Sequence, residues 1–419
     1  MFKKVILALA LIGMISGTAF AEDPILFGPY VQRVETEKAT VVWITSDRKV
    51  TLTGEGESRT RDNYRTNTIR FDGLKPDTEY NYKLEGGLEG KFRTAPAEPQ
   101  DFRFVVYGDT RSNADVHKSV VDAIRRQKDV RLVLNSGDLV SKGSVLDYWK
   151  EFFGVAEPLM RETYYVPCLG NHEDNAKEYF DFFDLPGNEE HFSFNWGGVH
   201  FVALNTEAPD IPDGTDNMAE SQIWNSEIMW KYFAKQREWL DKDLSLNYGA
   251  DFFVVFFHVP FYDSKLSRRE PQIEIRMAFA DILEKHNTEL VVTGHTHNYQ
   301  HHQKGMSHFV VSGGGGAGLY DIEDTLGVGA DDVEIVEQEK VNNFLVVDVE
   351  GWLLNIQALR PDDSVIEKFS VESQAGLRLV KRRVDSIGGL PWAQDDDDND
   401  DDDDDDDDDE VDYEIEVVK

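Results

Sequence analysis

The sequence predicts a small all-β sandwich, then a larger α/β domain with two sheets flanked by helices, and last a disordered acidic tail. Residues 24–95 contain short runs typical of strands, separated by turns, and no run with the period of a helix. From residue 101, apolar strand-like runs alternate with amphipathic helix-like runs, which is typical of an α/β domain. Residues 395–410 are acidic except for Asn399, and such a segment buries too little apolar surface to fold. We therefore expect two folded domains in the 419 residues.

The N-terminus has the pattern of an export signal. The basic start MFKK precedes an apolar run, Val5–Ile15, that is too short to span a bilayer. Ala19-Phe20-Ala21 fits a small-x-small cleavage site, which would leave Glu22 as the mature start. We expect residues 1–21 to be a signal peptide and the protein to be exported, to the periplasm or out of the cell. The alternative is a retained N-terminal anchor. No later apolar run is long enough to be a transmembrane segment.

Residues 24–95 are predicted to form an antiparallel sandwich. The segment TVVWITS alternates apolar and polar residues, and KFRTAP closes the region before the linker APAEPQ. The turn Leu74-Lys75-Pro76, followed by Tyr80, resembles the tyrosine corner of fibronectin type III domains. That resemblance implies a fibronectin type III-like fold for this region.

Residues 101–375 are predicted to form the α/β domain. Its strand-like runs are FRFVVYGD, RLVLNSGD, YYVPCLGNH, FFVVFFH and ELVVTGH. Helix-like stretches between them include SVVDAIRRQ, VLDYWKEFF, KQREWLDKDL and EIRMAFADILEKH. After residue 302, the runs HFVVSGG, NNFLVVDVEGWLLNIQAL and VIEKFSVES are expected to complete a second sheet. Residues 376–419 are predicted to be a linker and a disordered Asp-rich tail.

The charge of the chain argues against nucleic acid as a main partner. The net charge is −37, and Asp395–Glu410 supplies 15 of the negative charges, which leaves −22 for the rest. The acidic tail has three interpretations that the sequence leaves open: a solvated spacer, a weak binder of Ca²⁺ or mineral, or a partner for a basic surface. The one cysteine, Cys168, follows apolar residues and is expected to be buried.

Each of the five core strands ends in a residue that can bind a metal ion. These residues are Asp109, Asp138, Asn171, His258, His295 and His297. Because sites in open α/β sheets form at the carboxyl ends of strands, we expect them to converge at one sheet edge. Glycines beside four of the strand ends, Gly108, Gly137, Gly170 and Gly294, would permit sharp turns. His295 and His297, two residues apart, would face the same way on an extended segment.

Two metal ions suit this ligand set better than one. Two carboxylates, one amide and three imidazoles are too many ligands for a single zinc ion. They suit two ions about 3.5–4 Å apart that share a carboxylate, with Fe, Mn or Zn as the candidates. Taken one at a time, Asp109 and Asp138 could be turn-forming residues and His258 a buried structural histidine. Their joint placement at strand ends favours the metal interpretation.

The order of the motifs GD, GD, GNH, a lone His and GHTH resembles the calcineurin-like metallophosphoesterase superfamily. The spacing Val255-x-x-His258, Glu173 in GNHE and Tyr299 in GHTHNY look like the purple acid phosphatase branch, and the resemblance covers about residues 24–370. It implies a dinuclear centre that activates a bridging hydroxide for attack on phosphorus.

The resemblance also implies a role for each matching residue. Asp138 would bridge the two ions. Asp109 and His297 would hold the first ion, and the second would be held by Asn171, His258 and His295. His172 would contact phosphate and protonate the leaving oxygen.

Three positions depart from the family's pattern. Arg111 stands where the first motif often has a histidine, and Ser141 stands where purple enzymes have a tyrosine ligand. Leu266–Arg269 lacks a further phosphate-contacting histidine. We therefore expect no tyrosinate–iron colour. Arg111, Arg268 or Arg269 could contact phosphate instead. For Arg268 and Arg269 the sequence favours solvated surface arginines, whereas for Arg111, which stands beside a predicted ligand, the two interpretations are balanced.

Other conspicuous residues are expected to lie outside the ligand set. The run Gly313–Gly316 lacks the Gly-Lys-Ser/Thr of a phosphate loop and is predicted to pass close to the site or to another element. His117 and His200 are expected to be structural or exposed. His301 and His302 match no ligand position. The segment Thr206–Ser245 is expected to shape the substrate pocket.

The function that the sequence favours is that of an exported dinuclear-metal phosphoesterase acting on phosphate monoesters, with diesters as a second substrate class. One alternative is a secreted adhesion or mineral-binding protein with a degenerate phosphoesterase core. Another is a nucleotidase-like or phospholipid-directed phosphodiesterase of the same fold.

Overall fold

The computed structural model describes residues 5–6, 25–46, 56–60, 64–84, 88–207, 227–265, 269–323 and 332–386. Most of the predicted signal peptide, Arg268 and the Asp-rich tail lie outside these residues, as does the middle of Thr206–Ser245. Within residues 1–21, the described part is the two-residue strand β1 (Val5–Ile6), which pairs in parallel with β6. The signal peptide and the tail therefore stay predictions.

The N-terminal region is all β in its described residues, as predicted. A four-stranded antiparallel sheet has the order β2-β3-β5-β4, and β6 and β7 form a hairpin beside β1. The strands are β2 (Ile25–Gln32), β3 (Ala39–Thr45), β4 (Gly56–Thr60), β5 (Arg65–Phe71), β6 (Glu79–Lys83) and β7 (Glu89–Arg93). The backbone N–H of Lys75 donates to the Tyr80 hydroxyl at 2.9 Å, which is the hydrogen bond expected of a tyrosine corner. The fibronectin type III likeness stays a prediction.

This region shares its hydrophobic core with the α/β domain. Phe27 of β2 stacks on Phe153 with ring centroids 4.2 Å apart. The Tyr30 hydroxyl donates to the Phe182 carbonyl, and the Gln32 amide donates to the Tyr165 carbonyl at 2.9 Å. Because these contacts are buried, the β region braces the α/β domain directly.

Two sheets form the α/β domain. The six-stranded sheet has the order β10-β9-β8-β18-β19-β20, and the seven-stranded sheet has the order β11-β12-β13-β14-β16-β15-β17. The first comprises β8 (Phe102–Tyr107), β9 (Val130–Asn135), β10 (Tyr164–Pro167), β18 (Phe344–Glu350), β19 (Leu353–Leu359) and β20 (Val365–Glu372). The second comprises β11 (Phe192–Trp196), β12 (Val199–Ala203), β13 (Phe252–Phe256), β14 (Leu290–Thr293), β15 (Tyr299–Lys304), β16 (Ser307–Ser312) and β17 (Glu334–Glu339).

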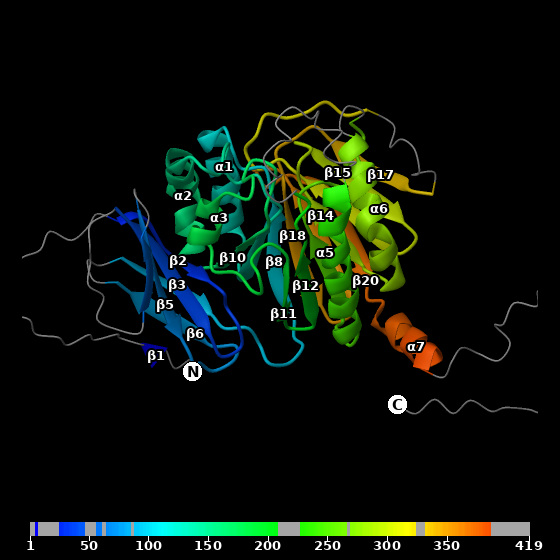
Figure 1. Ribbon diagram of the computed structural model, residues 1–419, viewed down its shortest axis with the longest axis horizontal. Helices are drawn as coiled ribbons and strands as arrows, with labels where there is room; N and C mark the ends of the chain where they lie inside the picture. Colours follow the sequence, from blue (N-terminus) through cyan, green and yellow to red (C-terminus); the bar gives the residue numbers. More distant parts are fainter. Residues whose placement is uncertain are drawn as a thin grey trace, which may run out of the picture. The chain divides into compact units, whose positions relative to one another are not determined.

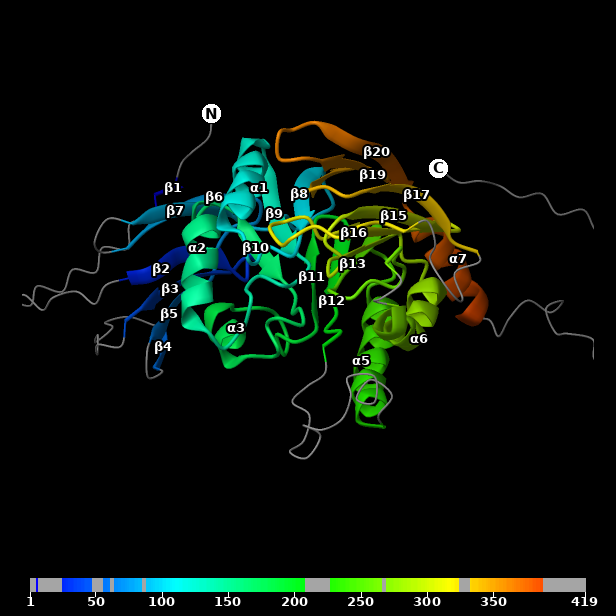
Figure 2. The same ribbon diagram turned by 90° about the horizontal axis from the view of Figure 1, so that it is seen from above.

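Helices flank the two sheets, as predicted. Figures 1 and 2 show α1 and α2 beside the strands β8–β10, and α5 and α6 beside the seven-stranded sheet. The helices are α1 (Ala114–Arg126), α2 (Leu146–Met160), α3 (Lys177–Phe182), α5 (Glu227–Leu246), α6 (Arg269–Lys285) and α7 (Ala375–Ser386). The two sheets pack on each other. For example, the rings of Phe104 in β8 and Phe201 in β12 are perpendicular, with their centroids 5.2 Å apart. None of the described helices is long and apolar enough to cross a membrane.

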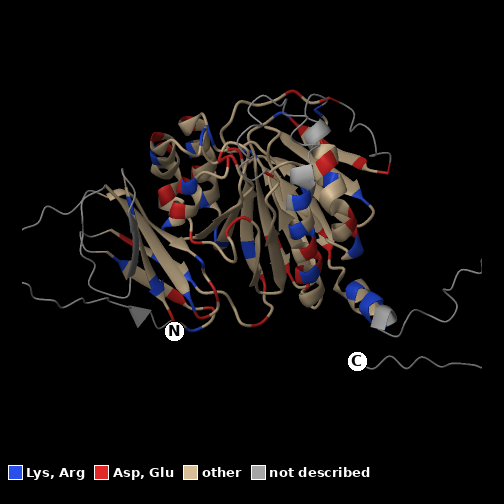
Figure 3. Ribbon diagram, viewed as in Figure 1, with Lys and Arg blue, Asp and Glu red and all other residues tan. Residues whose placement is uncertain are grey.

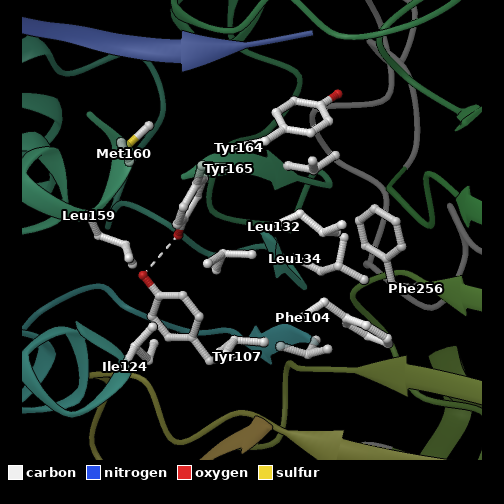
Figure 4. Close-up of a cluster of buried hydrophobic side chains, with 14 of the residues drawn as sticks. Phe104, Tyr107, Ile124, Leu132, Leu134, Leu159, Met160, Tyr164, Tyr165 and Phe256 are labelled. Carbon is white, nitrogen blue, oxygen red and sulfur yellow. Dashed lines mark hydrogen bonds between the residues drawn. The ribbon is translucent and has the colours of Figure 1, made fainter. Parts of the chain in front are cut away.

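The local sequence explains these elements. Helix α1 begins after Asn113, whose side chain accepts a hydrogen bond from the Val116 backbone, and its apolar face is buried. Strand β13, FFVVF, is buried at every position, because the sheet is covered on both faces. Figure 4 shows the core around β8–β10, where the Tyr165 hydroxyl donates to the Tyr107 hydroxyl at 3.0 Å. This packing holds the ends of the parallel strands in fixed positions.

Two expectations about the C-terminal half are wrong in detail. The strands after residue 302 do not form one second sheet. Strands β16 and β17 extend the sheet of β13 and β14, whereas β18–β20 extend the sheet of β8. Residues 375–386, assigned almost entirely to a linker, form helix α7, which carries several basic residues (Figure 3). The buried Arg378 in this helix donates to the Glu289 carboxylate at 2.6 Å. This hydrogen bond anchors the start of α7 to a residue that is distant in the sequence.

Candidate metal centre

The structure brings all six predicted ligands to one place. Asp109, Asp138 and Asn171 follow strands of the six-stranded sheet, whereas His258, His295 and His297 follow strands of the seven-stranded sheet. The prediction of a single sheet edge is therefore wrong, because the site lies where the carboxyl ends of two packed sheets meet. Asp109, Asp138, His258 and His297 are buried.

Three of the predicted ligands adopt a left-handed backbone conformation at the turns that follow their strands. Asp109, Asp138 and His295 have positive φ angles of 58°, 56° and 67°. Non-glycine residues adopt this region rarely, and where they do so the surrounding contacts must hold them there. The His295 backbone N–H donates to Asp109 Oδ2 at 2.9 Å, which is one such contact. His295 and His297 therefore lie on a bend and not on the extended segment that the sequence suggested.

The glycines beside the ligands serve close packing. A Cβ atom on Gly294 would lie 2.4 Å from Asp109 Oδ2, and one on Gly170 would lie 2.5 Å from Asp138 Oδ1. Both distances are shorter than a van der Waals contact, so no side chain fits. The backbone of Gly313–Gly316 also passes here, as predicted, with the Gly315 N–H donating to the Gly108 carbonyl at 2.9 Å.

Asp109, Asp138 and His297 form the first subsite. One ligand atom from each lies within 4.8 Å of the others. His297 Nδ1 lies 2.7 Å from the Gly318 carbonyl and donates to it, which leaves the lone pair of Nε2 turned toward Asp109 Oδ1 at 3.3 Å. Asp109 Oδ1 is buried, and no donor in the described part of the chain reaches it. A cation would satisfy this oxygen.

Asp138, Asn171, His258 and His295 form the second subsite. His258 Nδ1 donates to the Ser136 carbonyl at 2.8 Å, so Nε2 faces Asp138 Oδ1 at 3.2 Å and Asn171 Oδ1 at 3.1 Å. His295 Nδ1 lies 3.1 Å from the same Asn171 oxygen and 3.3 Å from His258 Nε2. Lone pairs that crowd together in this way repel one another unless a proton or a metal ion lies among them. The residues of both subsites therefore fit metal ions, with Asp138 between them.

The electrostatics of the centre agree with this fit. Burial alone would lower the pKa of His258, but Asp138 above all, with Asp109 and Glu207, raises it to about 10. Burial would raise the pKa of Asp138, but His258, His172 and Arg111 lower it. The metal-free centre therefore retains a proton where a metal ion would bind, and metal binding releases it.

Glu173 supports the centre in a way that the sequence did not predict. It is fully buried, and its carboxylate accepts the backbone N–H groups of Asp138 and Gly170 at 2.8 Å and of Val140 at 3.1 Å. Burial and the charge of Asp138 raise the pKa of Glu173 to about 8, against those backbone donors. Its position directly after His172 is the signal in the sequence, and by itself it indicates only the family resemblance.

Asp263 supports the GHTH loop, and nothing in its sequence context indicated this role. Its carboxylate accepts the hydroxyl of Thr296, which lies between two predicted ligands, and the amides of Gln272 at 2.7 Å and Gln300 at 2.9 Å. The side chain is fully buried. Since these donors converge on it together with the Lys265 backbone N–H, Asp263 fixes the loop that presents His295 and His297.

The two predicted catalytic side chains lie against Asp138. His172 Nδ1 donates to the Ser141 carbonyl at 2.7 Å, which leaves Nε2 3.8 Å from Asp138 Oδ2 on a side chain that is 30% exposed. Arg111 Nε donates to the same Asp138 oxygen at 3.0 Å. The catalytic roles of His172 and Arg111 stay predictions, as do the ligand roles of the six metal-binding candidates.

The remaining histidines and the cysteine lie outside the centre. His117 is buried beside Tyr107, and His200 contacts Asn195 and Asp243 at 2.7 Å each, so both are structural. Cys168 is buried, as expected. His302 is buried as well.

The substitution His301→Ala is expected to leave the metal content unchanged. His301 lies 3.0 Å from the Glu367 carboxylate and 2.9 Å from His308 Nδ1, and it stacks on Phe369, so it belongs to a separate network. The free energy of unfolding should fall by about 1–3 kcal/mol, because Glu367 loses a partner. Metal analysis of the purified variant checks this, with His297→Ala as the matched control that should lose metal. Loss of an ion from His301→Ala would show that the ligand assignment is wrong.

The iron-loaded protein is expected to show no tyrosinate-to-iron absorption band in the visible range. Ser141 occupies the position of the expected tyrosine, and its hydroxyl lies 3.2 Å from the Ser112 hydroxyl. The variant Ser141→Tyr should acquire such a band when iron is added. A visible spectrum of the two proteins at equal iron content checks this, and a tyrosinate band in the unsubstituted protein would contradict it.

Comparisons with known proteins agree with the motifs. Residues 102–299 match the calcineurin-like phosphoesterase family. Purple acid phosphatase 21 of Arabidopsis thaliana is 26% identical over 248 residues, which cover 55% of this chain and 52% of that protein. Purple acid phosphatase 18 of the same plant is 25% identical over 293 residues, which cover 62% of each chain. The chain thus spans about half to three fifths of the length of these curated relatives.

A solved structure extends the likeness to the fold. The purple acid phosphatase PPD1 from yellow lupin (Lupinus luteus) seeds matches with a TM-score of 0.65 at 18% identity, covering 84% of this chain and 75% of that chain. The fold and the converging ligands define a domain of the metallophosphoesterase class. Residues 102–299 form a calcineurin-like metallophosphoesterase domain, and purple acid phosphatases are its homologues, as the sequence motifs predicted.

Proposed function

We propose that the protein is an exported, metal-dependent phosphoesterase that uses two metal ions and hydrolyses phosphate monoesters. The observation that carries this proposal is the arrangement around Asp138. One of its carboxylate oxygens faces His258 at 3.2 Å, and the other faces Arg111 at 3.0 Å. Asp109 Oδ1 is buried nearby without a donor from the described residues. Such an arrangement can bind cations beside an anion.

The ions supply Lewis acidity, which activates water for attack on phosphorus and stabilises charge on the phosphoryl oxygens. The chain's own residues do the rest. Asp138 would contribute to both subsites. His172, whose Nδ1 donates to the Ser141 carbonyl, would give a proton from Nε2 to the leaving oxygen. Arg111 brings a guanidinium group that can bind a phosphate oxygen.

Export is proposed from the sequence alone, because MFKK, Val5–Ile15 and the Ala19–Ala21 cleavage pattern are typical of a signal peptide. We also propose that diesters are a poorer substrate class than monoesters. The acidic tail, residues 395–410, is proposed to act as a solvated spacer. Binding of Ca²⁺ or of a basic surface by the tail is the alternative that a truncation would test.

A substrate panel with defined metals tests the function. The full chain is stripped with a chelator, reloaded with Fe, Mn or Zn, and assayed on a chromogenic monoester, a chromogenic diester, nucleotides and a phospholipid headgroup diester. Metal-dependent hydrolysis, fastest on monoesters, is the expected result, and the chelated protein is the control. Fastest hydrolysis of nucleotides or of the lipid diester would instead favour the nucleotidase-like or phospholipid-directed alternative. A metal-loaded protein that hydrolyses none of them would overturn the proposal and leave the secreted binding protein.

A further inference from the structure

Arg111 reaches into the first subsite of the metal centre. Its Nε atom lies 3.0 Å from Asp138 Oδ2, and its Nη2 atom lies 3.4 Å from His297 Nε2. The side chain is largely buried, with 14% of its surface exposed. Its guanidinium therefore contacts two of the three residues that would hold the first ion, from the position where the family pattern often has a histidine.

The contact with His297 excludes a metal ion at that atom. His297 Nδ1 donates its proton to the Gly318 carbonyl, so Nε2 offers a single lone pair. One lone pair can accept a hydrogen bond from Arg111 or bind an ion, but it cannot do both. Asp138 Oδ2 is different, because a carboxylate oxygen has room for a metal ion and a hydrogen bond together.

We propose that Arg111 is a resident competitor of the first metal ion for His297 Nε2. The inference builds on the proposed metal centre but does not require that the protein hydrolyse phosphate esters. The guanidinium supplies a positive charge to the buried carboxylates of Asp109 and Asp138 until an ion arrives. The ion must displace Nη2 from His297, and this cost makes the first subsite weaker than the second.

The competition imposes an order on binding. Arg111 donates to Asp138, which both subsites share, and that hydrogen bond can persist when an ion binds. The other ligands of the second subsite make no hydrogen bond to Arg111 among the described residues, so we expect that subsite to fill first; they are Asn171, His258 and His295. When the first ion binds, Nε can stay on Asp138 while the Nη atoms swing away from His297. The freed Nη atoms are then available to an anion next to His172. Arg111 thus couples occupancy of the first subsite to phosphate binding.

Calorimetric titration of the metal-stripped full chain with Mn²⁺ or Zn²⁺ tests the proposal. We expect one tight and one weak site in the unsubstituted protein. The variant Arg111→Met, which keeps the aliphatic stem but loses the guanidinium, should bind the weak-site ion about tenfold more tightly, with the tight site unchanged. Arg111→Ala provides a second variant in case Arg111→Met does not fold, and circular dichroism checks the fold of both.

The matched control is Lys265→Ala. Lys265 Nζ lies 4.7 Å from the centroid of the Tyr320 ring, and that ring stacks on His297, so this cation is close but touches no ligand. If the effect came from general charge repulsion, Lys265→Ala would tighten the weak site as much as the Arg111 variants do, and the proposal would be wrong. Weaker or unchanged binding in both Arg111 variants would also overturn it. Ordered binding without any ester hydrolysis would sink the proposed function while supporting this inference.

Discussion

Replacing Asp138 with asparagine is expected to abolish metal binding at both subsites and to lower phosphate ester hydrolysis by about a thousandfold or more. Both carboxylate oxygens of Asp138 are in use: Oδ1 faces His258 and accepts the His172 backbone N–H at 3.0 Å, and Oδ2 faces Arg111. An asparagine side chain has the same shape, but it lacks the negative charge and presents a donor where a lone pair is needed. The substitution therefore tests charge and ligation with little change in packing.

Metal analysis and the rate of monoester hydrolysis measure this effect. The matched control is Asp174→Asn, because Asp174 lies on the same loop as Asn171, is exposed, and has a positive φ of 50° that asparagine tolerates. The control should retain both ions. An Asp138→Asn protein that keeps two ions and more than about a tenth of the rate would show that Asp138 does not bridge the subsites.

The second large effect is expected from Glu173→Gln. Above the Glu173 pKa of about 8, the ionised carboxylate accepts three backbone N–H groups, so the amide of glutamine would there place a donor against a donor. Because the side chain is fully buried, water cannot relieve that mismatch. We expect the free energy of unfolding to fall by about 2–4 kcal/mol. Metal affinity should fall too, since the loops of Asp138 and Gly170 lose their common anchor.

Urea denaturation of the chelated protein, above the Glu173 pKa of about 8, measures the change in stability, and a metal titration measures the affinity. Glu151→Gln, at an exposed position of α2, is the control and should change the free energy of unfolding by less than about 0.5 kcal/mol. A Glu173→Gln protein as stable as this control would show that the carboxylate is not the anchor described here.

Much of the architecture could be predicted from local patterns of apolar and polar residues in the sequence. Apolar runs that are followed by polar or ligand residues predicted five strands, β8, β9, β10, β13 and β14. A buried parallel strand is apolar along its whole length, and the first polar residues follow at its carboxyl end. The same pattern predicted the six side chains that the structure brings together. Helices α1, α2, α5 and α6 were visible from their amphipathic period.

Features that depend on contacts between residues distant in the sequence could not be predicted in this way. No local pattern shows that β8 and β13 belong to different sheets, since partners such as β18 come from far along the chain. The left-handed conformation of Asp109 and Asp138 is imposed by tertiary contacts and runs against their intrinsic preference. The anchoring role of Asp263 was hidden for a similar reason, because its partners Thr296 and Gln300 are more than thirty residues away.

Hydrolysis of a phosphate monoester in water enriched in heavy oxygen tests the central claim most directly. If activated water attacks phosphorus at the Asp138 centre, each phosphate released by the metal-loaded protein should carry one heavy oxygen, as measured by mass spectrometry, and the alcohol should carry none. Release should cease when the metals are chelated. Phosphate without the heavy oxygen, label in the alcohol, or release no faster than from the chelated protein would contradict the proposed reaction.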